Sequence, residues 1–198
     1  PRQCAALRDE THGEGFCRMP SVPVCARAAL HRWEEPCISG ETGAGTVFFS
    51  GCTLGCVFCQ NASISREGFG KALTGDELYA VFRRLADQGA SCIELVTPTH
   101  FTHALARVLE RPVPGGLPVV WNSGGCERAD TLKTPEGKVD VYLPDLKYVT
   151  PELAERYSGA ADYPEQAKDA IREMVRQRGP VRLENGLLKS GVLIRHLI

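Results

Sequence analysis

Short apolar runs alternate with helical patterns from residue 46 onward, and no other feature constrains the fold as strongly. Runs of strand length lie at 46–50, 92–96, 118–121, 139–143 and 191–198. Between several of them, apolar residues three or four positions apart predict helices over 74–88, 100–110 and 164–178. Repeated strand–helix–strand units form parallel sheets covered by helices, and continuous apolar strands indicate burial on both faces. We therefore predict an α/β fold with a parallel sheet of about five strands.

Residues 1–45 lack this alternation and contain four cysteines together with several Gly and Pro residues. We predict an irregular cysteine-containing segment at 1–45, with one short helix near 25–33, followed by a truncated α/β unit at 46–198. The chain begins at Pro1 rather than Met and ends inside an apolar run. We therefore expect a chain trimmed at both ends, with an open sheet edge beside the last strand.

Polar residues follow the first four predicted strands at the same end, and the fifth predicted strand carries polar residues itself. These residues are Ser50, Thr97–His100, Asn122–Gly125, Asp145–Lys147 and Arg195–His196. In parallel β/α barrels, the functional residues gather at the C-terminal ends of the strands. Any one of these groups is equally well explained as a helix cap or a structural ion pair. Five such groups at five strand ends predict a polar basin with a function.

The first predicted strand leads directly into Cys52, Cys56 and Cys59, spaced C-x3-C-x2-C. This triplet is one ligand short of a closed tetrahedral zinc site. Three thiolates can instead hold three irons of a cubane cluster and leave the fourth iron open for chemistry. Zinc remains an alternative, with a fourth ligand from Cys37, Cys92 or a histidine, and so does an electron-carrier cluster in which Cys37 completes four thiolates.

Composition argues against several other classes of protein. Hydrophobic residues make up 43% of the chain, as in ordinary globular proteins, and the net charge of −1 makes nucleic-acid binding an unfavoured function. No apolar stretch approaches the ~18 residues needed to span a membrane, and no signal-peptide pattern is seen. Nine cysteines, an odd number, fit metal binding in a reducing compartment better than a disulfide framework. We expect a cytoplasmic protein.

The cysteine motif resembles the signature of the radical S-adenosylmethionine (SAM) superfamily, in which an aromatic residue, here Phe58, precedes the last cysteine. Further stretches resemble the PflX-like branch, which is related to pyruvate formate-lyase activating enzyme. They are 31–40, 46–65, 96–101, 142–148 and 194–197. The resemblance covers essentially the whole chain. It implies a parallel (β/α) barrel whose core has six strands, so a chain with five is expected to form a partial barrel.

The resemblance also implies a chemistry. The three thiolates hold a [4Fe–4S] cluster, and SAM binds its open iron. One electron, from a donor such as flavodoxin or ferredoxin, cleaves SAM to methionine and a 5′-deoxyadenosyl radical. The radical takes a hydrogen atom from a substrate, which for activating enzymes is a glycyl radical site in a protein. Radical chemistry on a small metabolite and a non-catalytic iron–sulfur or zinc protein are the alternatives. The residues indicate neither the substrate nor the oligomeric state.

Residues that match the family's motifs are expected to bind SAM. By resemblance, Phe58 contacts the adenine, and Asn122 and Ser123 approach the methionine or ribose part. Asp145 and Lys147 match the Asp-Leu-Lys motif of activating enzymes. Lys147 and Arg195 are the cationic partners expected for the SAM carboxylate.

The chain departs from the family pattern in two places. Activating enzymes carry Gly-Gly-Glu after the second strand to bind the SAM amino group, whereas this chain has Thr97-Pro98-Thr99-His100. Thr99 and His100 are therefore expected to replace that motif. The family also has a C-x2-C pair before the segment that opens this chain. An auxiliary metal site is then expected to be incomplete here, with its remaining ligands drawn from Cys4, Cys17, Cys25 and Cys37.

Overall fold

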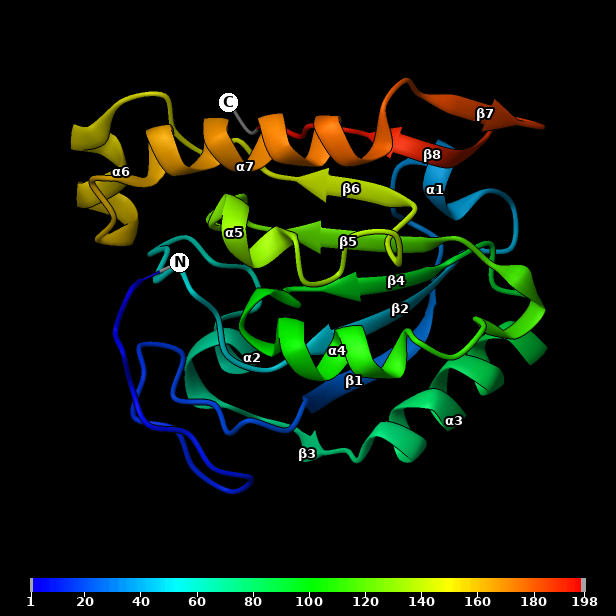
Figure 1. The fold of residues 1–198 in the computed structure, drawn as a ribbon, viewed down its shortest axis with the longest axis horizontal. Helices are drawn as coiled ribbons and strands as arrows, with labels where there is room; N and C mark the ends of the chain where they lie inside the picture. The colour runs from blue at the N-terminus through cyan, green and yellow to red at the C-terminus, as the bar shows by residue number, and fades with distance from the viewer. Residues whose placement is uncertain (1, 197–198) are drawn as a thin grey trace.

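The computed structural model describes residues 2–196, and an eight-stranded mixed sheet forms its centre (Figure 1). Across the sheet, the strands follow the order β3-β1-β2-β4-β5-β6-β8-β7. Their bounds are Val24–His31 (β1), Ala44–Phe49 (β2), Lys71–Ala72 (β3), Ile93–Val96 (β4), Val119–Ser123 (β5), Val141–Pro144 (β6), Arg182–Glu184 (β7) and Leu187–Val192 (β8). Neighbours in the run β2-β4-β5-β6-β8 pair in parallel. These five strands confirm the predicted parallel core of a partial barrel.

Antiparallel strands flank this core on both sides. β1 pairs with β2, β3 pairs with β1, and β7 pairs with β8. The last predicted strand begins at Leu187 rather than at residue 191, and β7 covers its outer edge along Leu187–Ser190. Beyond β8, Arg195 forms one parallel bridge with Asp145. Residues 197 and 198 of the predicted run lie outside the described residues.

Seven α-helices and two 3-10 turns connect the strands within residues 2–196. They are Pro36–Ser39 (α1), Ala62–Glu67 (α2), Gly75–Asp87 (α3), Thr102–Val108 (α4), Ala129–Leu132 (α5), Pro151–Ser158 (α6), Tyr163–Arg178 (α7), Thr99–Phe101 (η1) and Pro114–Gly116 (η2). Figure 1 shows α4, α5 and α7 lying in front of the sheet. The helix predicted over 100–110 is divided between η1 and α4.

The two longest helices begin and end at the residues that local chemistry favours. At the start of α3, the Glu77 backbone N–H donates to Thr74 Oγ1, and the Thr74 N–H donates to the Glu77 carboxylate. This reciprocal capping box satisfies two N–H groups that lack a helical partner. Helix α7 has Pro164 in its first turn and stops before Gly179, which has a φ of 64°. The predictions for both helices are confirmed.

Apolar side chains cover both faces of the sheet. On one face, strand residues such as Phe49 and Trp121 pack with Phe82 of α3 and Leu105 of α4. On the other face, Ile38 of α1 packs with residues of β5, β6 and β8, including Val120, Leu143 and Leu188. The predicted two-sided burial of the parallel strands is confirmed.

The helix predicted near 25–33 is wrong, because Val24–His31 is strand β1. Its pairs with β2 run from Cys25 opposite Phe49 to His31 opposite Ala44. The alanines and arginine of this segment favour a helix locally, but helix propensity is a weak preference. The exposed edge of β2 offers a full row of backbone partners, and this tertiary pairing determines the conformation.

Residues 2–23 contain no helix or strand, apart from a bridge between Arg8 and Gly13. Two arginines attach this segment to the rest of the chain. Arg2 donates to the carbonyls of Thr53 (2.7 Å) and Ser158 (2.9 Å), and Arg8 donates to the His100 carbonyl (2.7 Å) as well as to Met19 within the segment. Within residues 2–196, no helix combines the length and apolar character needed to cross a membrane.

Candidate functional site

Four of the predicted site residues meet where the parallel strands end. Arg195, after β8, donates through Nη2 to Asn122 Oδ1 at the end of β5 (2.6 Å). Its Nε donates to Asp145 Oδ1, after β6 (2.9 Å). Lys147 Nζ pairs with the other oxygen of Asp145 at 2.5 Å. The structure thus brings together Asn122, Asp145, Lys147 and Arg195.

Acidic side chains from two other elements join this network. Glu34, between β1 and α1, accepts from Arg195 Nη1 at 3.1 Å, and Glu35 lies 3.7 Å from the same nitrogen. Glu94 of β4 is fully buried and accepts from Thr46 Oγ1 (2.8 Å) and Asn122 Nδ2 (2.7 Å). The network therefore contains four carboxylates and two cations, and three of the carboxylates (Glu34, Glu35 and Asp145) pair directly with a cation.

Two glutamates of the network, Glu34 and Glu35, have pKa values above their ordinary range. Burial, followed by the neighbouring Glu34, raises the pKa of Glu35 to about 7. Burial also raises the pKa of Glu34, with Glu94 adding to the rise. Glu35 Oε2 is buried without a hydrogen-bond partner in the described residues. Carboxylates crowded in this way bind protons or cationic groups more readily than isolated ones.

The cysteine loop follows β2 and is held by the helices on either side. Gly51, with a φ of 77°, donates its N–H to Ile64 O in α2 (3.0 Å). Val57 donates its N–H to Tyr157 O in α6 (2.9 Å). A Cβ atom at Gly51 would lie 2.3 Å from Met19 Cγ and 2.9 Å from the Cys17 carbonyl oxygen. Both the left-handed backbone and the close approach of residues 17–19 therefore require glycine here.

Each cysteine sulfur of the triplet has a hydrogen-bonding neighbour. Cys52 Sγ accepts from the Leu54 N–H at 3.3 Å, and Cys59 Sγ lies 3.3 Å from Ser65 Oγ. Cys56 Sγ accepts from Ser158 Oγ at 2.9 Å. Burial raises the pKa of Cys52 to about 11, and the nearby Cys56 and Cys59 contribute to this rise while Lys147 opposes it.

The chemistry of these donors fits an iron–sulfur cluster. A single metal ion draws all of its ligands to within about 2–2.3 Å of one point. In a cluster, by contrast, the thiolates bind separate irons, and hydrogen bonds to the sulfurs are a normal part of the site. Cys52, Cys56 and Cys59 share one short loop, and each has a neighbour able to hydrogen-bond to its sulfur.

Thr99 and His100 are drawn into contacts outside the Arg195 network. Thr99 Oγ1 donates to Glu127 Oε1 at 2.6 Å, and His100 Nε2 lies 2.7 Å from the Ser50 carbonyl oxygen. Glu127 is fully buried, and burial raises its pKa. Burial lowers the pKa of His100 to about 4, so its ring is neutral at pH 7. The structure therefore gives both predicted residues well-defined structural partners.

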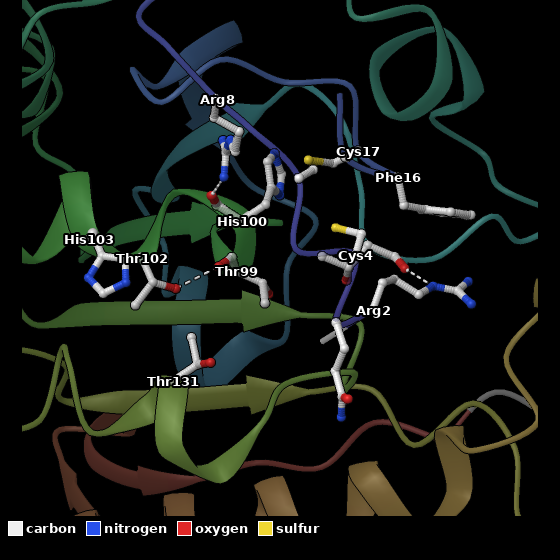
Figure 2. Close-up of a pocket in the computed structure, with 14 residues that line it drawn as sticks. Arg2, Cys4, Arg8, Phe16, Cys17, Thr99, His100, Thr102, His103 and Thr131 are labelled. Atoms are coloured by element: carbon white, nitrogen blue, oxygen red, sulfur yellow. Dashed lines mark hydrogen bonds between the residues drawn. The ribbon is translucent and has the colours of Figure 1, made fainter. Parts of the chain in front are cut away.

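A cavity of about 250 Å³ lies between residues 2–17 and the end of β4. Cys4, Cys17, Thr99 and His100 all line it, as Figure 2 shows. The other two N-terminal cysteines lie on different elements, Cys25 on β1 and Cys37 on α1. Of the four cysteines considered for an auxiliary site, only Cys4 and Cys17 line this cavity.

Of the two remaining predicted residues, Phe58 lies on the cysteine loop and Ser123 is the last residue of β5. The Phe58 side chain is 45% exposed, and its ring meets Tyr148 edge-on at a centroid distance of 6.3 Å. It is therefore accessible to a planar ligand. Ser123 is buried, and its hydroxyl accepts from the Gly125 N–H at 3.3 Å.

Sequence reasoning missed three residues around the site: Glu94, Tyr148 and Ser158. A charged residue within the apolar run 92–96 is unusual in a buried strand, so Glu94 carried a signal. Ser158 carried none, and Tyr148 carried only its place in the 142–148 stretch of the family resemblance. Their contacts with the cysteine loop join positions about a hundred residues apart.

Comparison with known proteins places this geometry in a family. An uncharacterized protein of Methanocaldococcus jannaschii, MJ0674, is 30% identical over 158 residues, covering 75% of this chain and 45% of that protein. The chain thus spans less than half of that relative's length. The crystal structure of QueE from Escherichia coli aligns with 89% of this chain and 84% of that chain, at 12% identity and a TM-score of 0.34. The sequence profile of the radical SAM superfamily matches residues 46–188, which include the cysteine triplet and most of the chain. The chain belongs to the radical SAM superfamily.

Proposed function

We propose that this protein is a radical SAM enzyme whose [4Fe–4S] cluster is held by Cys52, Cys56 and Cys59. The observation that carries the proposal is the placement of these three cysteines, each with a hydrogen-bonding neighbour, in a loop at the same end of the sheet as the Arg195 network. When bound, the cluster supplies one electron that cleaves SAM into methionine and a 5′-deoxyadenosyl radical. The protein's own residues bind and orient SAM and the substrate.

Residues at the strand ends would hold the two ends of SAM. Phe58, exposed on the loop, would pack against the adenine, and Asn122 and Ser123 would bind the ribose or methionine part. Lys147 and Arg195 would attract the carboxylate of SAM, while Glu34 would offer an acceptor for its ammonium group. Thr99 and His100 act on the same ligand only after giving up their contacts with Glu127 and Ser50.

The ion pairs of Arg195 bear on how SAM binds. Its guanidinium already contacts Glu34 at 3.1 Å and Asp145 at 2.9 Å. A carboxylate ligand therefore has to compete with these two acids for the same nitrogens. In this proposal, SAM binding includes a rearrangement of the Glu34 side chain.

We further propose that the enzyme belongs to the PflX-like branch and acts, like activating enzymes, on a glycyl site in a protein. Exposed apolar side chains support a large substrate, because Val57 and Val149 are 65% and 59% exposed and flank Phe58 and Tyr148 in the sequence. A flavodoxin or ferredoxin would deliver the electron in the reducing cytoplasm, where free thiols persist. A small metabolite is the competing substrate class. Radical transfer to candidate glycyl proteins, assayed beside small-molecule pools, separates the two.

Cluster assembly tests the proposed site. We would reconstitute the wild-type protein, Cys56→Ala and Cys92→Ala anaerobically and measure iron, sulfide and visible absorbance. Cys92 is the matched control, because its side chain is buried in the core and it lies just before the start of β4, at the opposite end of the sheet from the cysteine loop. The proposal predicts a cluster in the wild type and in Cys92→Ala, its loss in Cys56→Ala, and a change in the spectrum of the reduced cluster on adding SAM. A wild-type cluster that does not respond to SAM would refute the enzyme and support an electron carrier.

A further inference from the structure

One sulfur of the triplet lies in a different environment from the other two. Cys56 is buried, at 7% exposed, while Cys52 and Cys59 are partly exposed. Ser158 Oγ donates to Cys56 Sγ at 2.9 Å, which is short for a hydrogen bond to sulfur. The corresponding distances at Cys52 and Cys59 are both 3.3 Å. The strongest hydrogen bond of the triplet is therefore the one to Cys56.

A second hydroxyl stands behind Ser158. Tyr148 OH lies 2.7 Å from Ser158 Oγ, and both side chains are buried. A sulfur bound to iron carries no proton, so it can only accept a hydrogen bond. Because a hydroxyl carries a single proton, Ser158 Oγ then donates its one hydrogen bond to Cys56 Sγ and accepts a hydrogen bond from the Tyr148 hydroxyl. Iron binding therefore fixes the donor direction of both hydrogen bonds, from Tyr148 to Ser158 and from Ser158 to Cys56. Hydrogen bonds aligned in this way strengthen one another.

The surrounding structure holds both hydroxyls in place. Ser158 is the last residue of α6, and its carbonyl accepts from Arg2 Nη2 at 2.9 Å. The preceding residue, Tyr157, accepts from the Val57 N–H and so ties the same helix end to the cysteine loop. The Tyr148 ring packs edge-on against Tyr163 at a centroid distance of 5.4 Å. Neither hydroxyl can move far from Cys56 without disturbing the core around α6.

We propose that Tyr148 and Ser158 are positioning residues that set the reduction potential of the cluster through the Cys56 sulfur. This inference rests on the proposed function. Reduction adds one negative charge to the cluster, and a hydrogen bond to a ligand sulfur stabilises the more negative state more strongly. The Tyr148–Ser158 pair therefore makes the cluster easier to reduce by a one-electron donor. Removing the pair should make reduction harder without removing a ligand.

The test is a redox titration of the reconstituted cluster, followed by electron paramagnetic resonance of the reduced form. Ser158→Ala is expected to reduce the equilibrium constant for one-electron reduction about tenfold, which is a downward shift of about 59 mV. Tyr148→Phe keeps the ring and should shift the potential in the same direction by a smaller amount. Ser190→Ala is the matched control, since Ser190 is a buried serine of β8 that contacts Arg178 instead.

We call the two hydrogen bonds from Tyr148 to Ser158 and from Ser158 to Cys56 the relay. The outcomes distinguish this relay from the cluster itself. Equal iron content with potentials in Ser158→Ala and Tyr148→Phe that match Ser190→Ala would overturn the inference while leaving the proposed function intact. A wild-type protein that assembles no cluster overturns the proposed function and the relay with it. If Ser158→Ala does not retain its cluster, the potential of Tyr148→Phe decides: a downward shift supports the relay, and no shift overturns it.

Discussion

At the scale of single residues, burial raises the pKa of Glu35 and lowers the pKa of His100. Glu35 has its pKa raised to about 7, mainly by burial and then by Glu34, with Arg195 opposing the shift. His100 has its pKa lowered to about 4 by burial. The folded protein therefore favours the neutral form of both groups. The two groups change the free energy of unfolding over overlapping pH ranges and with opposite signs. The pH profile of the wild type alone therefore does not separate their contributions.

A Glu35→Gln variant isolates the acid. Between pH 4.5 and 7, folded Glu35 holds a proton that unfolded Glu35 has lost, so its contribution to stability falls as pH rises. His100 contributes in the opposite sense, because the unfolded chain binds its proton up to about pH 6.5. The variant should therefore gain stability relative to the wild type as pH rises from 5 to 7.5, by about 1–2 kcal/mol after allowing for partial exposure. Urea denaturation of the cluster-free proteins measures this, and parallel pH profiles would contradict it.

At the scale of elements, the segments that were predictable are those whose signals are local. Helix α3 carries its own capping box and a repeating apolar face, and its bounds agree with the prediction over 74–88. Strand β1 was not predictable from its own residues, because a distant partner determines its conformation. The β7–β8 hairpin was missed although its signal is local: Asn185 and Gly186, with φ values of 51° and 78°, form the turn between the two strands. The same division holds in the site. The cysteine spacing is local and could be read directly, whereas the contact of Ser158 with Cys56 joins residues 102 positions apart.

The cysteine loop depends on Gly51, and a pair of glycine substitutions measures how much. Gly51 and Gly89 have φ values of 77° and 85°, but a Cβ atom at Gly89 would meet nothing within 4 Å. Gly89→Ala should cost about 1 kcal/mol from backbone strain alone. Gly51→Ala adds the clash with Met19 and Cys17, and should cost at least about 2 kcal/mol more and lower the iron content after reconstitution. Equal stability of the two variants would show that residues 17–19 give way freely.

At the scale of the whole molecule, Arg195 joins parts of the chain that lie far apart in sequence. It connects the loop after β1, the end of β5 and the turn after β6 through Glu34, Asn122 and Asp145. Removing one partner of a largely buried network leaves the others uncompensated, and this costs far more than losing a surface ion pair. Arg195 is therefore expected to stabilise the fold as well as to bind a ligand.

Two arginine variants compare the largely buried Arg195 network with an ion pair at the surface. Arg195→Ala should destabilise the protein by about 2–3 kcal/mol, because Glu34 and Asp145 lose their shared cation. Arg176, whose side chain is 55% exposed, pairs with the partly exposed Glu136 and with the largely buried Glu173, and Arg176→Ala should cost about 1 kcal/mol. Chemical denaturation of the cluster-free proteins provides the free energies. A cost for Arg195→Ala as small as that for Arg176→Ala would mean that the network contributes no more than surface charges do.

The most direct measurement of the central claim is the formation of 5′-deoxyadenosine. The reconstituted and reduced wild-type protein is incubated anaerobically with SAM, and 5′-deoxyadenosine and methionine are quantified. Cys56→Ala serves as the negative control and Cys92→Ala as the matched positive control. We predict both products with the wild type and Cys92→Ala, and neither above background with Cys56→Ala. An intact wild-type cluster that yields no 5′-deoxyadenosine, or equal yields from all three proteins, would contradict the assignment of Cys52, Cys56 and Cys59 as the catalytic site.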